Sequence, residues 1–294
     1  MNLKNFHQKL ESELLEFRHS ETAFYSDPID CIDRNLSDED LEIVSFFVAA
    51  LSYGRVEQIK KSTDLFLQNF ARMGCKSNGA GISQLILQAS EDQLRENIGD
   101  SFCIWKHRLN TTRDIIECAL ALKRILTKHK TLSRCFQTYF TNLSLEAAMI
   151  KFSLDFSQKK IPKKRLRNPD KWSGTGLSWF APNPQDKGTC KRMLMWLRWM
   201  LRKDEIDFGI WKKESMQNTK MPLLNESHLM VPVDTHLHKW AIQNKITPTK
   251  SPNWKMVQEL TAFFKKLNPE DPLKYDFMIC HQGMKIFRLK EPRD

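Results

Sequence analysis

The sequence LEIVSFFVAALS (residues 41–52) is apolar on nearly every side of a helix. A helix without a polar face is buried, so this stretch predicts a helix at the centre of the core. It follows Ser37, a residue type that caps helices, and acidic residues occupy positions 38 to 40 in the first turn. It ends at Tyr53-Gly54-Arg55, a break that leads into a further helix through Ile59 and Leu65.

Amphipathic patterns extend outward from this stretch in both directions. Apolar residues at three- and four-residue steps predict helices over 3–17, 82–97, 112–128, 132–141 and 145–156. Residues 25–35 contain Pro28 and several aspartates and predict a connecting loop. No window alternates polar and apolar residues between turn signals, so strands are expected to be minor. The pattern therefore predicts an all-α protein.

The composition is that of a globular chain with a basic excess. Of 294 residues, 46 are Lys or Arg and 35 are Asp or Glu, a net charge of +11 (46 − 35), and 41% are hydrophobic. The longest nearly apolar run, residues 43–53, is shorter than the roughly 18–20 residues that cross a bilayer, and the N-terminal residues lack a signal peptide's apolar core. We expect a soluble, cytoplasmic protein. The charge favours a polyanionic partner, and the alternative is a basic protein without one.

The cysteines and histidines indicate no metal site. Seven cysteines are scattered along the chain without a CxxC pair, which argues against a disulfide framework, a zinc module and a cysteine-held iron–sulfur cluster. His236 and His238 are two residues apart and would point in different directions on a helix. No serine elbow accompanies Asp234 and His236, so a hydrolase triad is not expected. We expect neither a metal nor a cofactor.

A basic, punctuated segment covers residues 159–188. It contains Lys163, Lys164 and Arg165, followed by several glycines and prolines. A run of charge is ordinarily a solvated insertion. This one stands directly before the most informative part of the chain, which favours contacts with phosphate groups. Trp172 and Trp179 in the same region would either stack on a nucleotide or anchor packing.

Two stretches downstream carry the chemistry. GTCK (residues 188–191) opens the strongly apolar helix MLMWLRWML (residues 193–201), and MVPVDTH (residues 230–236) leads into LHKWA (residues 237–241), which predicts another helix start. Either half alone has an ordinary explanation, because a lysine in a first helical turn is usually a surface residue and an aspartate before a helix is usually a cap.

Together the two stretches resemble the helix-hairpin-helix DNA glycosylase superfamily, which includes endonuclease III and 8-oxoguanine DNA glycosylase. VPVDTH is similar to the corresponding stretch of the eukaryotic-type 8-oxoguanine enzymes. The wider pattern, from Ser26-Asp27-Pro28 to Gly283 and including DPLKYDF (residues 271–277), also resembles a bacterial branch known mainly as a domain of unknown function. In the superfamily a hairpin precedes the helix that carries the catalytic lysine, and a Gly/Pro-containing loop ends at the catalytic aspartate. The resemblance therefore implies that Lys191 and Asp234 are catalytic.

The resemblance also implies a two-lobed, all-α glycosylase-like fold with a central cleft. A helical barrel lobe would cover 36–203, and 1–35 plus 204–294 would form a second helical lobe that carries the aspartate loop. The spacing of 43 positions from Lys191 to Asp234 (234 − 191) requires an insertion over 203–228. The usual Leu-Pro-Gly-Val-Gly hairpin is replaced by residues 182–188, which leaves the hairpin register open, with Lys187 as the alternative nucleophile.

Elementary electrostatics agrees with these implied roles. The positive end of a helix macrodipole disfavours the ammonium form of Lys191, and burial against Met195 and Trp196 would act in the same direction. Asp234, at the start of the next helix, would be held ionised. A lysine amine can then attack the sugar C1′ and form a Schiff base, while the carboxylate stabilises the oxocarbenium-like charge.

The function implied is excision of an oxidised purine, 8-oxoguanine first, with strand nicking by β-elimination. The expected partner is double-stranded DNA with a damaged base, bound by a nucleoid-associated monomer without membrane contact. Two alternatives remain, a non-catalytic DNA- or RNA-binding relative and a small-nucleoside N-glycosidase. The residues expected to contact DNA are Tyr53, Arg55, Lys163, Lys164, Arg165, Lys187, Gly188, Arg192, Arg198, Arg202 and His236. Those expected in the base pocket are Trp196, Asp276, Phe277, His281 and Gln282.

Two of these assignments have a structural alternative of equal weight. Tyr53 and Arg55 would fill the gap left by a flipped nucleotide, or they would simply follow a helix end closed by Gly54. Phe277 would stack on the base and Gln282 would read its edge, or Phe277 would be a core residue with surface polar residues around it.

Overall fold

The computed structural model describes residues 2–18, 27–140, 142–158, 176–212 and 223–288. Nearly all regular structure in these ranges is helical, which confirms the predicted all-α class. The strands within them, β1 (Lys106–His107) and β2 (Asn110–Thr111), have two residues each and pair antiparallel. Within the described part of the chain, no helix is long and apolar enough to cross a membrane.

Helix α2 (Asp38–Leu51) is the centre of the core, as predicted. Twelve of its 14 residues are buried. The Ser37 side chain accepts a hydrogen bond from the Asp40 amide at 3.2 Å, which confirms the predicted N-cap. The helix ends before Gly54, which lies in the turn between α2 and α3 (Val56–Arg72). Its φ of 104° is a backbone conformation that glycine adopts without steric cost.

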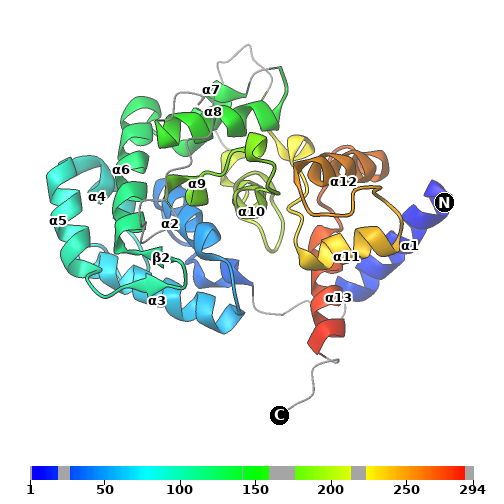
Figure 1. Cartoon of the computed structure of the whole chain (residues 1–294), viewed down its shortest axis with the longest axis horizontal. Coiled ribbons are helices and arrows are strands. Elements are labelled where there is room, and N and C mark those ends of the chain that lie inside the picture. Colours follow the sequence, from blue (N-terminus) through cyan, green and yellow to red (C-terminus); the bar gives the residue numbers. More distant parts are fainter. Residues whose placement is uncertain (1, 19–26, 141, 159–175, 213–222, 289–294) are drawn as a thin grey trace.

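The other helices of this part of the molecule surround α2 on one side of Figure 1. They are α3, α4 (Ile82–Gln88), α5 (Glu91–Ser101), α6 (Thr112–His129), α7 (Leu132–Tyr139), α8 (Leu145–Ser157) and α9 (Leu177–Phe180). The prediction of a single helix over 82–97 is wrong. The first helix ends before Ala89, which has an extended backbone, and a second helix begins after its N-cap, Ser90. Ser90 and Gln93 cap α5 reciprocally, each side chain accepting from the other's amide.

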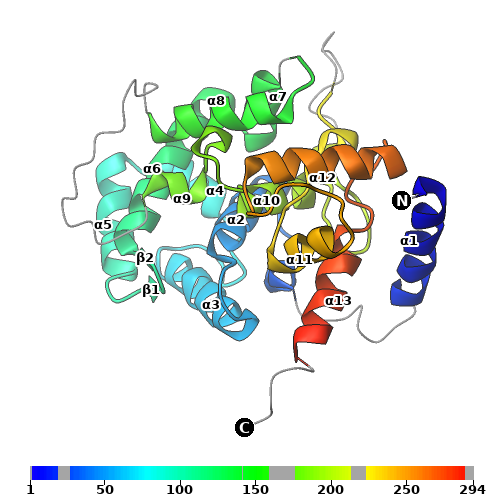
Figure 2. The same ribbon diagram turned by 45° about the vertical axis from the view of Figure 1, so that its right-hand side comes forward.

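A second group of helices lies on the other side of α10 (Lys191–Leu201), as Figures 1 and 2 both show. It consists of α1 (Leu3–Arg18), α11 (Thr235–Gln243), α12 (Trp254–Leu267) and α13 (Asp276–Arg288). α10 packs against α2, and the Trp196 indole N–H donates to Ser45 Oγ at 3.0 Å. The helix with the candidate lysine is therefore held by the central core helix.

Two short 3₁₀ helices tie distant segments to α2. Pro28–Cys31 forms η2, inside the predicted loop, and packs on α2 and α3. Ile210–Lys212 forms η4, and its Trp211 indole donates to Glu42 at 2.6 Å. Both segments belong to the predicted second lobe yet contact the central helix of the first. The lobe boundaries at 36 and 203 stay a prediction.

Glu42 is a buried polar residue within the apolar helix α2. Besides Trp211, its carboxylate accepts from the amides of Leu132 and Ser133 at 2.8 and 2.9 Å, at the start of α7. Burial raises the pKa of Glu42 to about 7, and these three donors act against that increase. Glu42 thus joins α2, α7 and η4.

Candidate active site

Lys191 and Asp234 face each other. Lys191 Nζ lies 3.9 Å from Asp234 Oδ2, and the side chains are 38% and 8% exposed. Asp234 caps α11, and its Oδ1 accepts hydrogen bonds from the amides of His236 and Leu237 at 2.9 and 2.7 Å. One carboxylate oxygen therefore serves the helix, while the other faces the lysine. The structure brings the predicted pair together across 43 residues of sequence (234 − 191).

The loop before α10 sets the register of the lysine. Lys187 and Cys190 both have left-handed backbone conformations, with φ of 65° and 50°. The turn at Cys190 makes Lys191 the first residue of α10. Lys187 is exposed in the loop and does not line the cleft described below, and its carbonyl accepts from the Trp254 amide at 3.2 Å. Of the two candidate lysines, the geometry thus favours Lys191.

The pair lines a cleft of about 690 Å³. Its walls come from the start of η2, the turn between α2 and α3, the loop and first turn of α10, and the start of α11. The polar side chains of the lining belong to Asp27, Ser52, Tyr53, Thr189, Lys191, Arg192, Asp234, Thr235 and His238. Gly188 also lines the cleft and is exposed. The cleft therefore carries both a primary amine and a carboxylate.

Arg192 is a cation that lines this cleft. Among the described residues, no carboxylate forms an ion pair with it. Its guanidinium lies 3.6 Å from the Trp179 ring centroid and 5.5 Å from that of Tyr53. Its hydrogen bond, to the Trp179 carbonyl, is 3.5 Å long. Burial lowers the pKa of Arg192 to about 10. The arrangement suits an anion that enters the cleft, in line with the predicted DNA contact.

Tyr53 is fixed in the cleft wall rather than projecting freely. Its hydroxyl lies 2.5 Å from the His107 carbonyl and 2.7 Å from Asn110 Oδ1, both on the β1–β2 hairpin. Its ring meets Trp179 edge-on at 4.8 Å. Arg55 is exposed beside it at the start of α3. Tyr53 can line the path of a bound strand, whereas its anchored hydroxyl opposes insertion of the ring between base pairs.

The predicted phosphate contact of Arg198 is wrong. Arg198 is 5% exposed, and its guanidinium pairs with Asp207 at 3.2 Å and Asp276 at 3.1 Å. Arg202 is likewise buried, with Asp207 and Asp271 at 3.2 and 3.0 Å. The sequence shows both arginines on one helix, but it does not show that carboxylates from later segments pair with them. Asp276, 2% exposed, is occupied by Arg198 and is not available to a base.

Trp196 is also misassigned to a base pocket. It has no exposed surface and packs edge-on against Phe46 at 5.1 Å between ring centroids, so it belongs to the core. His281 is buried behind Phe277, with their rings stacked at 3.9 Å, so it can support Phe277 but does not present a free face. Gln282 is half-buried on α13.

His236 is a packing residue between α11 and α13. A Cβ built on Gly283 would lie 2.8 Å from the His236 Cβ, so this approach requires a glycine. The contact places α13 against the helix that Asp234 caps. The structure therefore gives His236 a role in positioning the site, and its predicted DNA contact stays a prediction.

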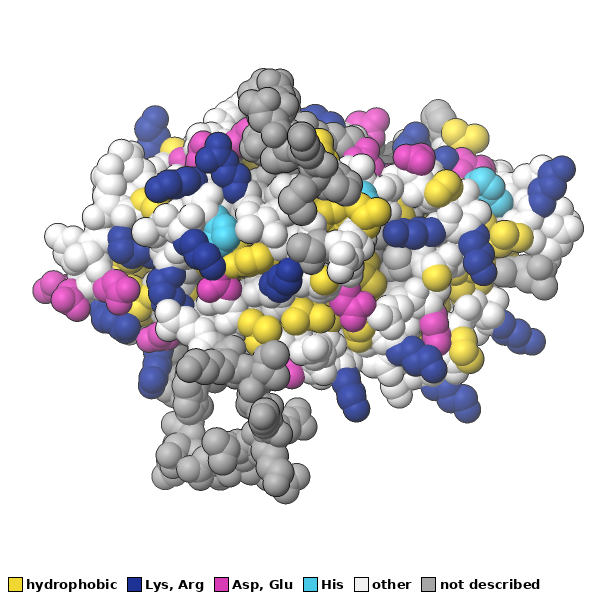
Figure 3. Space-filling view, turned by 90° about the horizontal axis from the view of Figure 1, so that it is seen from above, with side chains coloured by type: hydrophobic (Ala, Val, Ile, Leu, Met, Phe, Trp, Pro, Cys, Tyr) yellow, Lys and Arg dark blue, Asp and Glu magenta, His cyan; other side chains and the backbone are white. Residues whose placement is uncertain are grey.

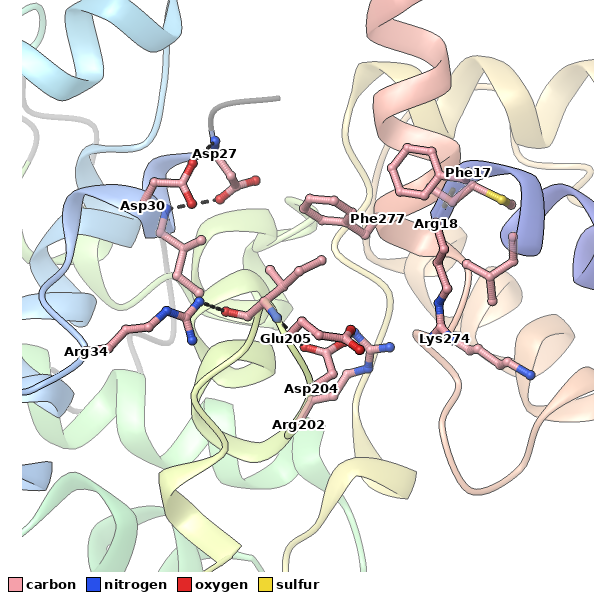
Figure 4. Close-up of a pocket in the computed structure, with 14 residues that line it drawn as sticks. Phe17, Arg18, Asp27, Asp30, Arg34, Arg202, Asp204, Glu205, Lys274 and Phe277 are labelled. Atoms are coloured by element: carbon pink, nitrogen blue, oxygen red, sulfur yellow. Dashed lines mark hydrogen bonds and ion pairs between the residues drawn. The ribbon is translucent and has the colours of Figure 1, made fainter. Parts of the chain in front are cut away.

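A second cavity, of about 490 Å³, adjoins the cleft and shares Asp27 with it. Phe277 projects into it from α13, between Asp27 and Asp30 on one side and Phe17 and Arg18 on the other (Figure 4). The rest of its lining is Leu14, Ile29, Arg34, Arg202, Asp204, Glu205, Ile206, Lys274 and Met278. The sequence predicts a role for Phe277 but misses Asp27. An aspartate in a loop before a proline carries no signal of a functional role.

The remaining predicted contacts belong to the basic segment that precedes α10 in the sequence. Lys163, Lys164, Arg165 and Trp172 lie outside the described residues. On the face shown in Figure 3, Lys and Arg side chains are spread across the molecule with Asp and Glu between them. No cluster of three or more candidate metal ligands occurs among the residues that the structure describes, and the seven cysteines are free.

Comparison with known proteins places the site in a family without an assigned activity. A family model described as "Protein of unknown function (DUF2400)" matches residues 27–285. The match includes Lys191, Asp234 and both cavities' main walls, but not α1. No curated protein and no solved structure matches the chain.

Proposed function

We propose that this chain, which belongs to the family described as a protein of unknown function (DUF2400), is a DNA base-excision glycosylase with associated lyase activity. The observation that carries the proposal is the 3.9 Å approach of Lys191 Nζ to Asp234 Oδ2 in a cleft with room for a nucleotide. The resemblance of the same two residues to the helix-hairpin-helix glycosylases supports it.

Each partner has a defined part in the reaction. The neutral amine of Lys191 attacks the sugar C1′, the bond from C1′ to the base breaks, and the base leaves with the electron pair and takes up a proton from water. The Asp234 carboxylate lies beside the positive charge that develops on the sugar and stabilises it. Opening of the sugar ring gives a Schiff base between C1′ and Nζ. Loss of the 3′ phosphate by β-elimination then nicks the strand, and water releases the lysine.

The adjoining cavity supports this assignment because it can receive the base. An enzyme that acts on a base in a duplex must take that base out of the stack and hold it by stacking and by contacts to its edges. With the sugar at the Lys191–Asp234 pair, the shared residue Asp27 places the cavity next to it. Phe277 offers an aromatic surface in that cavity. We take an oxidised purine, 8-oxoguanine first, as the substrate.

DNA binding would rest on phosphate contacts that set affinity rather than base choice. The net charge of +11 supports a polyanionic partner, and Arg192 supplies a cation inside the cleft. Arg198 and Arg202 do not contribute, because their charges are compensated by buried carboxylates.

Borohydride trapping tests the proposal. The protein is mixed with a duplex that contains 8-oxoguanine, the Schiff base is reduced, and a covalent protein–DNA adduct is sought. We expect an adduct with the wild type and none with Lys191→Gln, while the neighbouring variant Lys187→Gln still forms it. Loss of the adduct in Lys187→Gln alone would move the nucleophile to that residue. No adduct with 8-oxoguanine, abasic or other damaged duplexes would overturn the proposal in favour of a non-catalytic binding protein.

A further inference from the structure

Helix α1 lies outside the residues that the family model matches, yet it forms one wall of the second cavity. Leu14, Phe17 and Arg18 line that wall. Figure 4 shows Phe17 and Arg18 on the far side of the cavity from Asp27, with Phe277 between the two sides. The cavity is therefore completed by an element from the opposite end of the chain.

α1 is held firmly in this place. Lys274 Nζ lies 2.7 Å from Glu11 Oε1, and His7 Nε2 lies 2.9 Å from the Tyr275 hydroxyl, which also bonds Glu11. Phe17 meets Phe277 edge-on with 6.1 Å between ring centroids. These contacts join α1 to the segment that begins α13. The wall is part of the folded site, and its side chains can select a ligand.

The two sides of the cavity differ in charge. Asp27, Asp30 and Glu205 supply carboxylates on one side, where Arg34 donates to the Ile206 carbonyl and Arg202 pairs with Asp204. The Asp27 carboxylate accepts from the amides of Ile29 and Asp30, and the Asp30 carboxylate accepts from the Asp27 amide at 2.8 Å. Across the cavity, Arg18 is an exposed cation beside Lys274. A planar ligand between them would meet acceptors on one edge and donors on the other.

We propose that Phe17 and Arg18 determine which base the cavity accepts, and that this base is a guanine-type oxopurine; the inference rests on the proposed glycosylase function. 8-Oxoguanine carries N–H donors at N1 and N2 on one edge, from which the carboxylates accept, and a carbonyl at C8 on the opposite side of the ring, to which Arg18 donates. Adenine presents an unprotonated ring nitrogen on that edge, which carboxylates repel. Phe17 and Phe277 pack on the ring itself.

The test compares trapping rates on three duplexes that contain 8-oxoguanine, 8-oxoadenine or an abasic site. The abasic duplex has no base to place, so the ratio of trapping on 8-oxoguanine to trapping on the abasic site isolates the cavity's contribution. We expect the wild type to prefer 8-oxoguanine over 8-oxoadenine by at least about tenfold. Arg18→Gln should lower the 8-oxoguanine ratio by about tenfold, because one charged hydrogen bond is removed.

Two further variants complete the design. Phe17→Leu keeps an apolar side chain and should lower the same ratio severalfold by removing the ring. Lys4→Gln removes one positive charge from the exposed start of the same helix. Lys4 does not line the cavity, so the ratio should be unchanged.

The outcomes separate this inference from the function on which it rests. Adducts whose ratio is the same in the wild type, Arg18→Gln and Phe17→Leu would overturn the role of α1 while leaving the glycosylase proposal intact. An equal or greater preference for 8-oxoadenine would overturn the assignment of the base. Absence of adducts on all three duplexes with the wild type would overturn the function, and the inference with it.

Discussion

Arg198 Nη1 and Asp276 Oδ2 lie 3.1 Å apart in a buried ion pair that joins α10 to α13. Arg198 stands seven residues after Lys191 on α10 (198 − 191), and Asp276 directly precedes Phe277. The pair thus fixes the helix of the candidate nucleophile relative to the wall of the second cavity, the proposed base site. Asp207 and Arg202 extend the network and bind the segment after α10 into it.

Removing Arg198 should destabilise the fold rather than weaken binding to phosphate. Arg198→Met removes the ion pair of Asp276 and leaves Asp207 paired with Arg202, and breaking a buried pair costs about 3–5 kcal/mol. Urea unfolding measures the decrease, with exposed Arg55→Met as the control that should change stability by less than about 0.5 kcal/mol. Normal stability of Arg198→Met together with weaker DNA binding would restore the phosphate role.

Asp234→Asn should separate the capping role of this residue from its chemical role. Asparagine caps helices about as well as aspartate, so the unfolding midpoint should change little. The rate of adduct formation should fall by about 100-fold or more, because the charge beside the sugar is removed. Asp234→Ala should show the same fall in rate and also a decrease of about 1 kcal/mol in stability. A rate near that of the wild type in Asp234→Asn would exclude the electrostatic role.

Gly283→Ala should disturb the site from a distance. The new methyl group would lie 2.8 Å from the His236 Cβ, so α11 and α13 must move apart. We expect a destabilisation of about 1–3 kcal/mol and slower adduct formation, since Asp234 caps α11. Gly99→Ala in α5 is the matched control, because nothing lies within 4 Å of its Cβ and its stability should increase by about 0.5–1 kcal/mol. Thermal unfolding of both variants would show whether the two signs differ.

Arg192→Gln should remove a single cation from the proposed DNA-binding cleft. Each Lys or Arg that neutralises a phosphate of duplex DNA adds about 0.9 to the slope of log K against log salt concentration, so the slope of this variant should be shallower by that amount. The cation is without a carboxylate among the described residues, so its replacement should leave the unfolding midpoint nearly unchanged or slightly higher. An unaltered salt slope would show that Arg192 serves only to pack on Trp179.

Stability should decrease as the pH rises from about 4.5 to about 7, on account of Glu42. Burial raises the pKa of Glu42 from 4.5 to about 7 in the folded protein, so the folded state keeps a proton that the unfolded chain releases. The stabilisation is complete below the unfolded value and disappears as the pH passes the folded value. The change amounts to about 3 kcal/mol at most.

Glu42→Gln provides the control for that pH dependence. It should be less stable at low pH, because the amide NH₂ faces the backbone donors of α7, but its unfolding midpoint should vary less between pH 4.5 and 7. Equal pH slopes in both proteins would assign the effect to another group.

Local signals predicted what depends on neighbouring residues in the chain. The cap at Ser37, the apolar α2 and the helix starts at Lys191 and Asp234 all follow from residues within a turn of each other. The helix boundary at Ser90 was missed although Ser90 and Gln93 have the spacing of a capping box, because the apolar pattern continues across it. The candidate catalytic pair came from the family resemblance, which supplied the pairing that spacing alone does not.

Tertiary partners account for what the sequence did not predict. An arginine on one face of a helix looks the same in the sequence whether that face meets solvent or a buried carboxylate. The sequence therefore predicts a surface cation at Arg198, although Asp276 covers it. Trp196 follows Lys191 closely in sequence but points into the core toward Phe46. The contribution of α1 to a cavity formed with α13 has no sequence signal, since nothing local connects Phe17 with Phe277.

The anchorage of α1 has a consequence for how the protein is made. His7 and Tyr275, which meet where α1 packs, are 268 residues apart in the chain. At about 5–20 residues per second, the ribosome needs roughly 13–54 s to supply the second partner after the first. During that interval the amphipathic helix carries its apolar side chains without their final partners, and the second cavity has not yet formed. The nascent chain therefore gains its proposed selectivity only once Tyr275 and α13 have been synthesised, after the central helices have had time to fold.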